Sequence, residues 1–205
     1  SIIPDADGNI WYMGNSNASI GKLNPTTGTI TEYETQARDP HSATFHPNGR
    51  LFFTAQAASM LGRLSPETGE ITEIQTEQRP YGIQVGPDGT LWIAYNGTNK
   101  IGALNPETMA VRYYDVPNEA SRIRRLGLSS DGMVWYGNST MGRIGVPRAT
   151  RSFLPRCSPA VMRNIERRIP FECLVSTSTS IMSQPSGKLG AAKSLIRCPL
   201  LPSAS

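Results

Sequence analysis

The chain has 205 residues and a formal net charge of +4. Residues 1–145 hold 11 Lys or Arg and 14 Asp or Glu, whereas residues 146–205 hold 9 and 2, so the basic excess belongs to the second part alone and predicts no nucleic-acid surface on the first. The three cysteines, an odd number without a Cys-x-x-Cys pair, argue against a disulfide framework and against a zinc site.

Residues 1–145 contain a repeat of about 41 residues. An acidic or amide residue followed by glycine recurs with the glycines 41, 40 and 43 residues apart, a large aromatic residue stands three positions after each glycine, and an aliphatic-Gly pair recurs with the same spacings. The glycines of the first pair are Gly8, Gly49, Gly89 and Gly132, the aromatic residues are Trp11, Phe52, Trp92 and Trp135, and the glycines of the second pair are Gly21, Gly62, Gly102 and Gly145. A repeat of this length belongs either to a helical solenoid or to propeller blades.

The local pattern in each repeat predicts β-strands. An Asp-Gly or Asn-Gly pair between short apolar runs is the strongest hairpin signal, because the turn needs positive φ at its central positions. No window has an apolar stripe at helical spacing that is long enough for a helix, which removes the solenoid interpretation. In the best preserved repeat the expected strands are residues 82–85, 91–95, 100–104 and 111–114. Four antiparallel strands per repeat predict a propeller blade.

In chain order, the predicted blades span residues 1–34, 41–76, 81–116 and 124–145. The first has room for only the end of its first strand, and no initiator Met or leader precedes it, so we expect a segment of a longer product. The fourth stops after three strands. The predicted fold is therefore all-β, a partial β-propeller of about three and a half four-stranded antiparallel blades, and an arc of this size leaves unpaired edges.

Residues 146–205 differ in character from the repeats. They contain no Asp, Trp, Tyr or His, hold all three cysteines and include an unbroken Ser/Thr run at residues 176–180. Two interpretations stay open: a disordered basic tail rich in Ser, Arg and Pro, or a frameshifted, non-native continuation that ends the repeat in the middle of a blade. Arg163, Arg167 and Arg168 sit at helical spacing, but without aromatic residues in number or a binding motif we expect neither a nucleic-acid nor a membrane partner.

The innermost strand of each blade lines the propeller channel, and the starts of these strands meet at one end of a funnel, where ligands usually bind. Aligned on the Asp-Gly turns, the strand-start position holds His41, Tyr81 and Arg124, and the position two residues earlier holds Asp39, Arg79 and Arg122. This polar ring is either a site for a small molecule or peptide, with Tyr81 and Arg124 as substrate-binding residues, or a hydrated channel wall.

Two further expectations concern the remaining aromatic and histidine residues. Trp11, Trp92 and Trp135 occupy equivalent strand positions, so they are predicted to pack between blades rather than to bind ligand. His46 stands beside Pro47 in a hairpin and is predicted to be a solvent-exposed turn residue.

The blade motifs resemble those of the virginiamycin B lyase, or streptogramin lyase, family. The matching motifs are Pro40-His41, Pro80-Tyr81-Gly82-Ile83, Leu91-Trp92-Ile93, Asn99-Lys100-Ile101-Gly102 and Ile71-Thr72-Glu73. The resemblance covers residues 1–145 and none of the tail. It implies a bacterial antibiotic-resistance enzyme, a seven-bladed propeller that opens the ester-linked ring of type B streptogramins by elimination with magnesium and a histidine base.

The family's catalytic signature is a Glu-Pro-His at one strand start and a second Glu at the end of the next strand. Asp39-Pro40-His41 comes nearest to it, so the resemblance makes Asp39 a metal ligand and His41 the catalytic base. At the place of the second carboxylate the chain has Ala55-Gln56, which leaves Gln56 as the other candidate ligand, although Mg²⁺ prefers charged oxygen.

Two functions from different classes follow. The first is a lyase that opens a cyclic depsipeptide or lactone by Mg²⁺-dependent elimination with an incomplete catalytic set. The second is a non-catalytic propeller that binds a sugar, peptide or protein through its funnel. We expect a monomer in either case, and the sequence indicates no cellular compartment.

Overall fold

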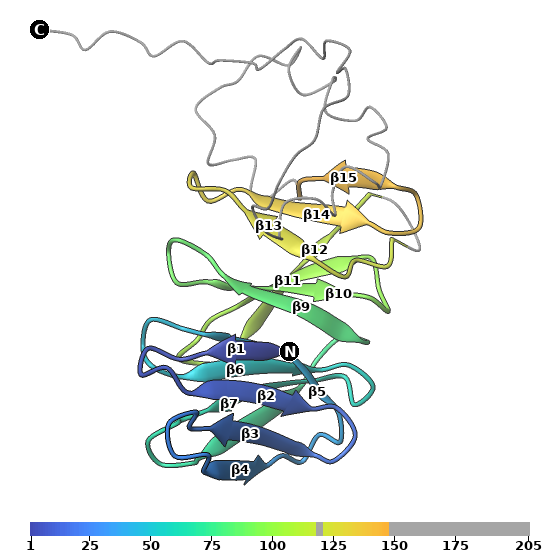
Figure 1. Cartoon of the computed structure of the whole chain (residues 1–205). Helices are drawn as coiled ribbons and strands as arrows, with labels where there is room; N and C mark the ends of the chain where they lie inside the picture. Colours follow the sequence, from blue (N-terminus) through green and yellow to red (C-terminus); the bar gives the residue numbers. More distant parts are fainter. Residues whose placement is uncertain (118–120, 148–205) are drawn as a thin grey trace, which may run out of the picture.

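The computed structural model describes residues 1–117 and 121–147, so the predictions for the tail lie outside the described residues. The described residues form strands only, and they contain no helix that is long and apolar enough to span a membrane. Figure 1 shows four antiparallel sheets that follow one another in chain order, from the blue first blade through the green third blade to the yellow fourth. The all-β, partial-propeller prediction is confirmed.

Each sheet is a meander in which strands adjacent in sequence are paired. Blade 1 contains β1 (Ile2–Pro4), β2 (Ile10–Gly14), β3 (Ser19–Leu23) and β4 (Ile30–Glu34). Blade 2 contains β5 (Pro40–Phe45), β6 (Leu51–Ala55), β7 (Met60–Leu64) and β8 (Ile71–Gln75). Blade 3 contains β9 (Pro80–Val85), β10 (Leu91–Tyr95), β11 (Lys100–Leu104) and β12 (Val111–Asp115). Blade 4 is described through β13 (Leu126–Leu128), β14 (Val134–Asn138) and β15 (Arg143–Gly145).

The strands predicted for the best preserved repeat agree closely with blade 3. β10 and β11 have the predicted bounds, whereas β9 begins at Pro80 rather than at residue 82, and β12 extends to Asp115. The early start of β9 follows a register shift between Ile93 and Tyr95 of β10, a bulge that lets Tyr95 pair with Pro80. Periodicity located the strands, but it carried no signal for this bulge.

The recurring turn glycines have the conformation that the hairpin argument requires. Gly8, Gly49, Gly89 and Gly132 have φ between 82° and 83°. In three of these turns the preceding side chain also accepts a backbone N–H two residues ahead, and the acceptors are Asn48, Asp88 and Asp131. The Asp-Gly or Asn-Gly pair therefore combines a left-handed glycine with a local side-chain acceptor.

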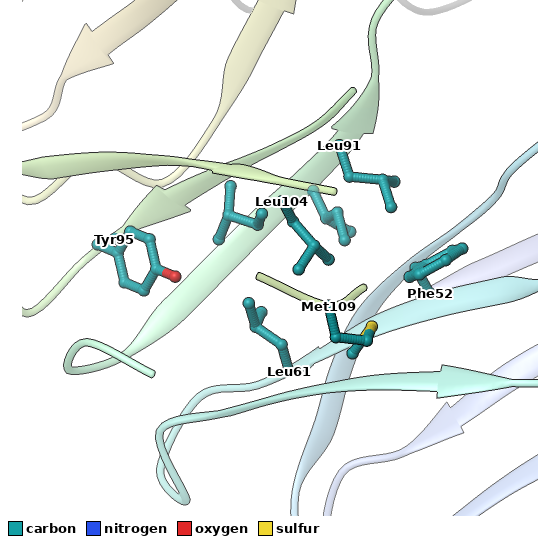
Figure 2. Packing of buried hydrophobic residues seen from close by; sticks show 8 residues of the cluster. Phe52, Leu61, Leu91, Tyr95, Leu104 and Met109 are labelled. Atoms are coloured by element: carbon teal, nitrogen blue, oxygen red, sulfur yellow. The ribbon is translucent and has the colours of Figure 1, made fainter. Parts of the chain in front are cut away.

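Three of the four recurring aromatic residues fill the space between neighbouring sheets, whereas Trp135 is partly buried and lies outside the clusters that they form. One apolar cluster joins Trp11 of blade 1 to β5, β6 and β7, and another joins Trp92 of blade 3 to β13 and β14. Figure 2 shows the cluster between blades 2 and 3, in which Phe52 and Leu61 meet Leu91, Leu104 and Met109. The predicted packing role of Trp11 and Trp92 is confirmed, and apolar burial of this kind is the main stabilising term of a propeller.

The glycine of each aliphatic-Gly pair lies beneath an aromatic ring of the neighbouring strand. A Cβ at Gly62 would collide with the ring of Phe53, and a Cβ at Gly102 would lie 2.9 Å from a ring atom of Tyr95. Gly21 and Gly145 are covered in the same way by Tyr12 and Tyr136. This repeat feature is therefore a packing requirement, because no side chain larger than hydrogen fits under the ring.

The prediction for His46 is wrong. Its ring is partly buried between blades 2 and 3, where Nδ1 accepts the N–H of Asn48 at 3.1 Å and Nε2 donates to the carbonyl oxygen of Gly89 at 3.0 Å. The ring also meets Phe52 edge-on at 5.8 Å. Hairpin chemistry predicted the turn correctly, but a contact with the next blade, 43 residues away, left no local signal.

Candidate functional site

The first strands of blades 2, 3 and 4 lie side by side, and their starts bring the predicted substrate-binding residues together. The ring centroids of His41 and Tyr81 are 4.3 Å apart at an interplanar angle of 52°. The guanidinium carbon of Arg124, which precedes β13, lies 5.9 Å from the centroid of Tyr81. Residues from three blades therefore meet at Tyr81, as the alignment of strand starts predicted.

Arg125 also belongs to this cluster, although the sequence reasoning missed it. Its guanidinium carbon lies 5.1 Å from the centroid of Tyr81, and its Nη1 donates to Ser42 Oγ at 3.4 Å. Alignment on the Asp-Gly turns selects one residue per blade and so selected Arg124 only. The sequence feature that could have indicated Arg125 is its position directly after Arg124.

Bulges at the strand starts orient His41 and Tyr81. In blade 2 the register shifts between Pro40 and Ser42, so His41 has no directly paired residue on β6. The shift in β9 removes the same pairing for Tyr81. A bulge turns a side chain out of the regular alternation of a strand, which explains how residues in a tightly stacked sheet reach the end of the channel.

Three backbone contacts fix the relative positions of the blades here. The buried hydroxyl of Thr54 accepts the N–H of Ser42 at 3.2 Å and donates to the carbonyl oxygen of Tyr81 at 2.8 Å, which links β5 to β9. A Cβ at Gly82 would lie 2.5 Å from the carbonyl oxygen of Arg124, so the chain entering blade 4 passes directly over this glycine. The sheets thus hold His41 and Tyr81, whereas Arg124 and Arg125 lie in the segment that leads into β13.

Ser42 connects the imidazole to a guanidinium. His41 Nδ1 lies 3.0 Å from Ser42 Oγ, and the same oxygen accepts from Arg125. Burial lowers the pKa of His41 below its ordinary value, the ammonium of Ser1 and the guanidinium of Arg125 lower it further, and Asp39 opposes them. The imidazole is therefore held in its neutral form near pH 7.

Arg124 and Arg125 are not paired with a carboxylate anywhere in the described ranges. The salt bridges found there are Arg50–Glu107 and Lys100–Glu77, both away from this cluster. Both arginines are exposed, and beside the ring of Tyr81 their contacts within residues 1–117 and 121–147 include the hydrogen bond from Arg125 to Ser42. The end of the channel therefore carries two guanidinium groups around one aromatic ring.

Asp39 does not face this cluster as a free carboxylate. Its Oδ2 accepts the N–H of Ala57 in a short hydrogen bond, and its Oδ1 accepts the N–H of Ala58 at 3.0 Å. The carboxylate thus caps the turn between β6 and β7, the same turn that contains Gln56. The equivalent residues Arg79 and Arg122 have φ of 58° and 45°, a left-handed conformation that Asp39 does not share.

The described residues do not fit a magnesium ion at the predicted ligands. No group of three or more His, Cys, Asp or Glu side chains gathers in residues 1–117 or 121–147. Magnesium requires near-octahedral oxygen ligation with one or two carboxylates. Both carboxylate oxygens of Asp39 already accept hydrogen bonds from backbone N–H groups. A magnesium site formed by Asp39 and Gln56 stays a prediction that this geometry does not favour.

Two surface hollows of the described blades lie away from the cluster. One, of about 520 Å³, is lined by residues 15–18 with Arg38 and Asp39 between blades 1 and 2. The other, of about 440 Å³, lies against His46 and the β11–β12 turn. Neither of these two hollows is lined by His41, Tyr81 or Arg124.

Comparisons with known proteins agree with this architecture. The structure of a catalytically inactive His-to-Ala variant of virginiamycin B lyase from Staphylococcus aureus with quinupristin is similar with a TM-score of 0.65 at 30% identity, covering 71% of this chain and 50% of that one. A streptogramin B lyase structure is similar with a TM-score of 0.64 at 28% identity, covering 71% and 49%. The chain spans about half the length of these lyases.

A search of curated proteins finds no match to the chain. The sequence profile described as the virginiamycin B lyase family matches residues 1–146, which is the same part of the chain that carries the repeat. The chain therefore belongs to the virginiamycin B lyase family.

Proposed function

We propose that the strand starts of blades 2, 3 and 4 form a ligand-binding surface for a small molecule or peptide. The observation that supports this most is the meeting of His41, Tyr81 and Arg124 from three different blades around a single ring. The two rings, tilted by 52° to each other, offer their faces to a planar or apolar group, and the guanidinium donates hydrogen bonds to oxygen atoms of the ligand. These blades bind without a metal in this proposal.

Quinupristin is the first ligand to titrate, because it is the compound in the structure of the similar inactive lyase. Calorimetry with the full chain measures its Kd, and the Tyr81→Ala variant should weaken binding at least about 10-fold by removal of the stacking ring. Tyr114→Ala is the matched control, since Tyr114 also lies under an arginine, with the Arg112 guanidinium carbon 5.2 Å from its centroid, but on the outer strand β12.

If quinupristin does not bind, a wider set of neutral and charged small molecules is titrated into the protein. The proposal fails if no ligand perturbs the NMR signals of His41 and Tyr81, or if Tyr81→Ala and Tyr114→Ala weaken binding equally.

The second candidate is elimination on a cyclic depsipeptide or lactone with His41 as base. Two observations favour it: membership of the lyase family, and a His41 imidazole that is neutral and so able to accept a proton. A base at Nε2 requires the tautomer in which Nδ1–H donates to Ser42 Oγ. This activity is proposed for the whole protein. The present chain spans about half the length of the solved lyases.

Ring opening of quinupristin, followed by mass spectrometry, tests this candidate. Activity that is lost in His41→Ala and retained in His46→Ala would support His41 as the base. Turnover that is unchanged in His41→Ala, or no turnover by the full chain with magnesium, would count against it.

A further inference from the structure

Several cations of the described blades lie over aromatic rings, as Lys22 does at Trp11 and Arg112 at Tyr114, but at Tyr81 two guanidinium groups lie at one ring. Arg50 and Lys100 pair with carboxylates, and Arg63 donates to the carbonyl oxygens of Pro106 and Glu107 at 3.1 and 3.0 Å. Arg124 contacts the ring of Tyr81, and Arg125 contacts the same ring and Ser42. The fold itself thus places positive charge here without an opposite charge from the described residues.

Asp39 acts electrostatically on His41, but among the described residues it forms no salt bridge with either arginine. Asp39 begins blade 2 at the same end of the channel, but both of its carboxylate oxygens accept backbone N–H groups of Ala57 and Ala58. Both guanidinium groups are exposed, so their mutual repulsion is weak, and an anion that contacts both would remove it.

The unused hydrogen-bond donors point to the same kind of ligand. A guanidinium has five N–H donors in a rigid planar arrangement that matches a carboxylate or a phosphate in bidentate fashion. Arg125 donates one of them to Ser42, at the long distance of 3.4 Å. Both guanidinium carbons lie near the ring of Tyr81, at 5.9 and 5.1 Å from its centroid, and both side chains are exposed and so accessible to a ligand.

We infer that the ligand of this surface carries an anionic group, a carboxylate or a phosphate, that Arg124 and Arg125 hold beside Tyr81. This inference rests on the proposed binding function and specifies its ligand class. An aromatic or planar part of the same ligand would lie against His41 and Tyr81, whose rings are 4.3 Å apart.

The probes are benzoate, phenyl phosphate and benzamide, titrated into the ¹⁵N-labelled full chain and followed by two-dimensional NMR. Benzamide is the neutral match of benzoate, so the ratio of their Kd values isolates the charge. We expect at least one anionic probe to bind at least about 10-fold more tightly than benzamide, because charge-assisted hydrogen bonds are the stronger class. Tighter binding of benzoate or of phenyl phosphate identifies the carboxylate or the phosphate as the preferred group.

The double variant Arg124→Gln/Arg125→Gln should remove the preference for anionic probes, whereas Arg112→Gln, the matched control on β12, should retain it. Arg124→Lys/Arg125→Lys keeps the charge and, if the glutamine variant fails to fold, should retain a weaker preference that increasing salt reduces. Equal binding of benzamide and both anions, an unchanged ratio in the double variant, or no binding of any probe overturns the inference. If neutral ligands still bind through Tyr81, the proposed function stands and only the anionic class is wrong.

Discussion

Equivalent repeat positions carry similar residues where blades pack together and different residues at the end of the channel. Between blades, equivalent positions carry equivalent residues, as with Trp11, Phe52 and Trp92, because every pair of sheets has the same gap to fill. At the strand starts, the equivalent residues are His41, Tyr81 and Arg124, which differ in charge and size. Packing therefore determines the first set, whereas the second set departs from the repeat and forms the surface for which we propose ligand binding.

Asp39 shows that polar character alone does not separate these two regions. It stands at the end of the channel, yet both carboxylate oxygens cap a turn and serve the fold. Glu73 on the outer strand β8 has a similar role. Its carboxylate accepts the N–H groups of Gln36 and Ala37, at 2.7 and 3.1 Å, and these two residues belong to the linker between blades 1 and 2. A carboxylate in this propeller is thus assigned by its contacts and not by its position.

The largest predicted effect tests the packing side of this comparison. Gly62→Ala would force a Cβ into the ring of Phe53, and overpacking of this kind costs about 3 kcal/mol of unfolding free energy. Gly137→Ala is the control, since no atom lies within 4 Å of the new Cβ. Urea unfolding followed by fluorescence measures both, and equal stability of the two variants would contradict the packing explanation of the aliphatic-Gly pair.

Met109 allows packing and backbone conformation to be separated at one position. It is 5% exposed within the cluster of Figure 2 and has φ of 61°, where the equivalent residues of the earlier blades are Gly28 and Gly69. Met109→Ala should cost about 2–3 kcal/mol through loss of burial while keeping the unfavourable φ.

Met109→Gly loses the same side chain but removes the strain, so it should be about as stable as the alanine variant or up to about 1 kcal/mol more stable. This is the reverse of the usual order for these two residues. Denaturation midpoints of the two variants measure it, and a clearly more stable alanine variant would show that the left-handed conformation costs little here.

A smaller effect is expected at Asp39, where the comparison is between a capping and a metal-binding role. Asp39→Ala leaves two backbone N–H groups without their acceptor and should destabilise the protein by about 1–2 kcal/mol, whereas Asp39→Asn keeps one oxygen and should lose less. Thermal unfolding in EDTA and in magnesium chloride should give the same values. A wild-type stabilisation by magnesium that disappears in Asp39→Asn would instead support metal binding.

The smallest effect is the pH dependence contributed by His41. Its pKa in the folded protein is lowered from 6.5, so below that pH the unfolded chain binds the proton more readily. Stability should therefore fall as the pH drops from about 6.5 toward the folded pKa, and His41 should contribute nothing above that range.

NMR titration of the His41 ring measures this pKa. Arg125→Gln should raise it, because the guanidinium is one cause of the shift, while Tyr81 and Asp39 remain in place. An unchanged value in Arg125→Gln would mean that burial and the Ser1 ammonium account for the whole shift.

The sequence was sufficient for the fold because the fold repeats. The turn glycines, the aromatic residue three positions later and the aliphatic-Gly pair each report a requirement that every blade shares, and so four copies reinforce one prediction. The alignment of strand starts likewise brought His41, Tyr81 and Arg124 to one place.

The remaining features of the site depend on contacts between strands that no local pattern contains. The bulges at His41 and Tyr81 are register shifts within one sheet, whereas the bridge of Thr54 to Tyr81 and the second arginine at the ring are contacts between neighbouring blades. The same reason explains why His46 was misplaced. Asp39 was predicted as a metal ligand because a motif gives residue types, whereas the turn that occupies its carboxylate is visible only in three dimensions.

The affinity for benzoate in the presence and absence of magnesium tests the central claim most directly. If Arg124, Arg125 and Tyr81 recognise the ligand without a metal, the Kd of the full chain is the same in EDTA as in excess magnesium chloride and rises at least about 10-fold in Arg124→Gln/Arg125→Gln. Binding that requires magnesium and is indifferent to the two arginines would contradict it.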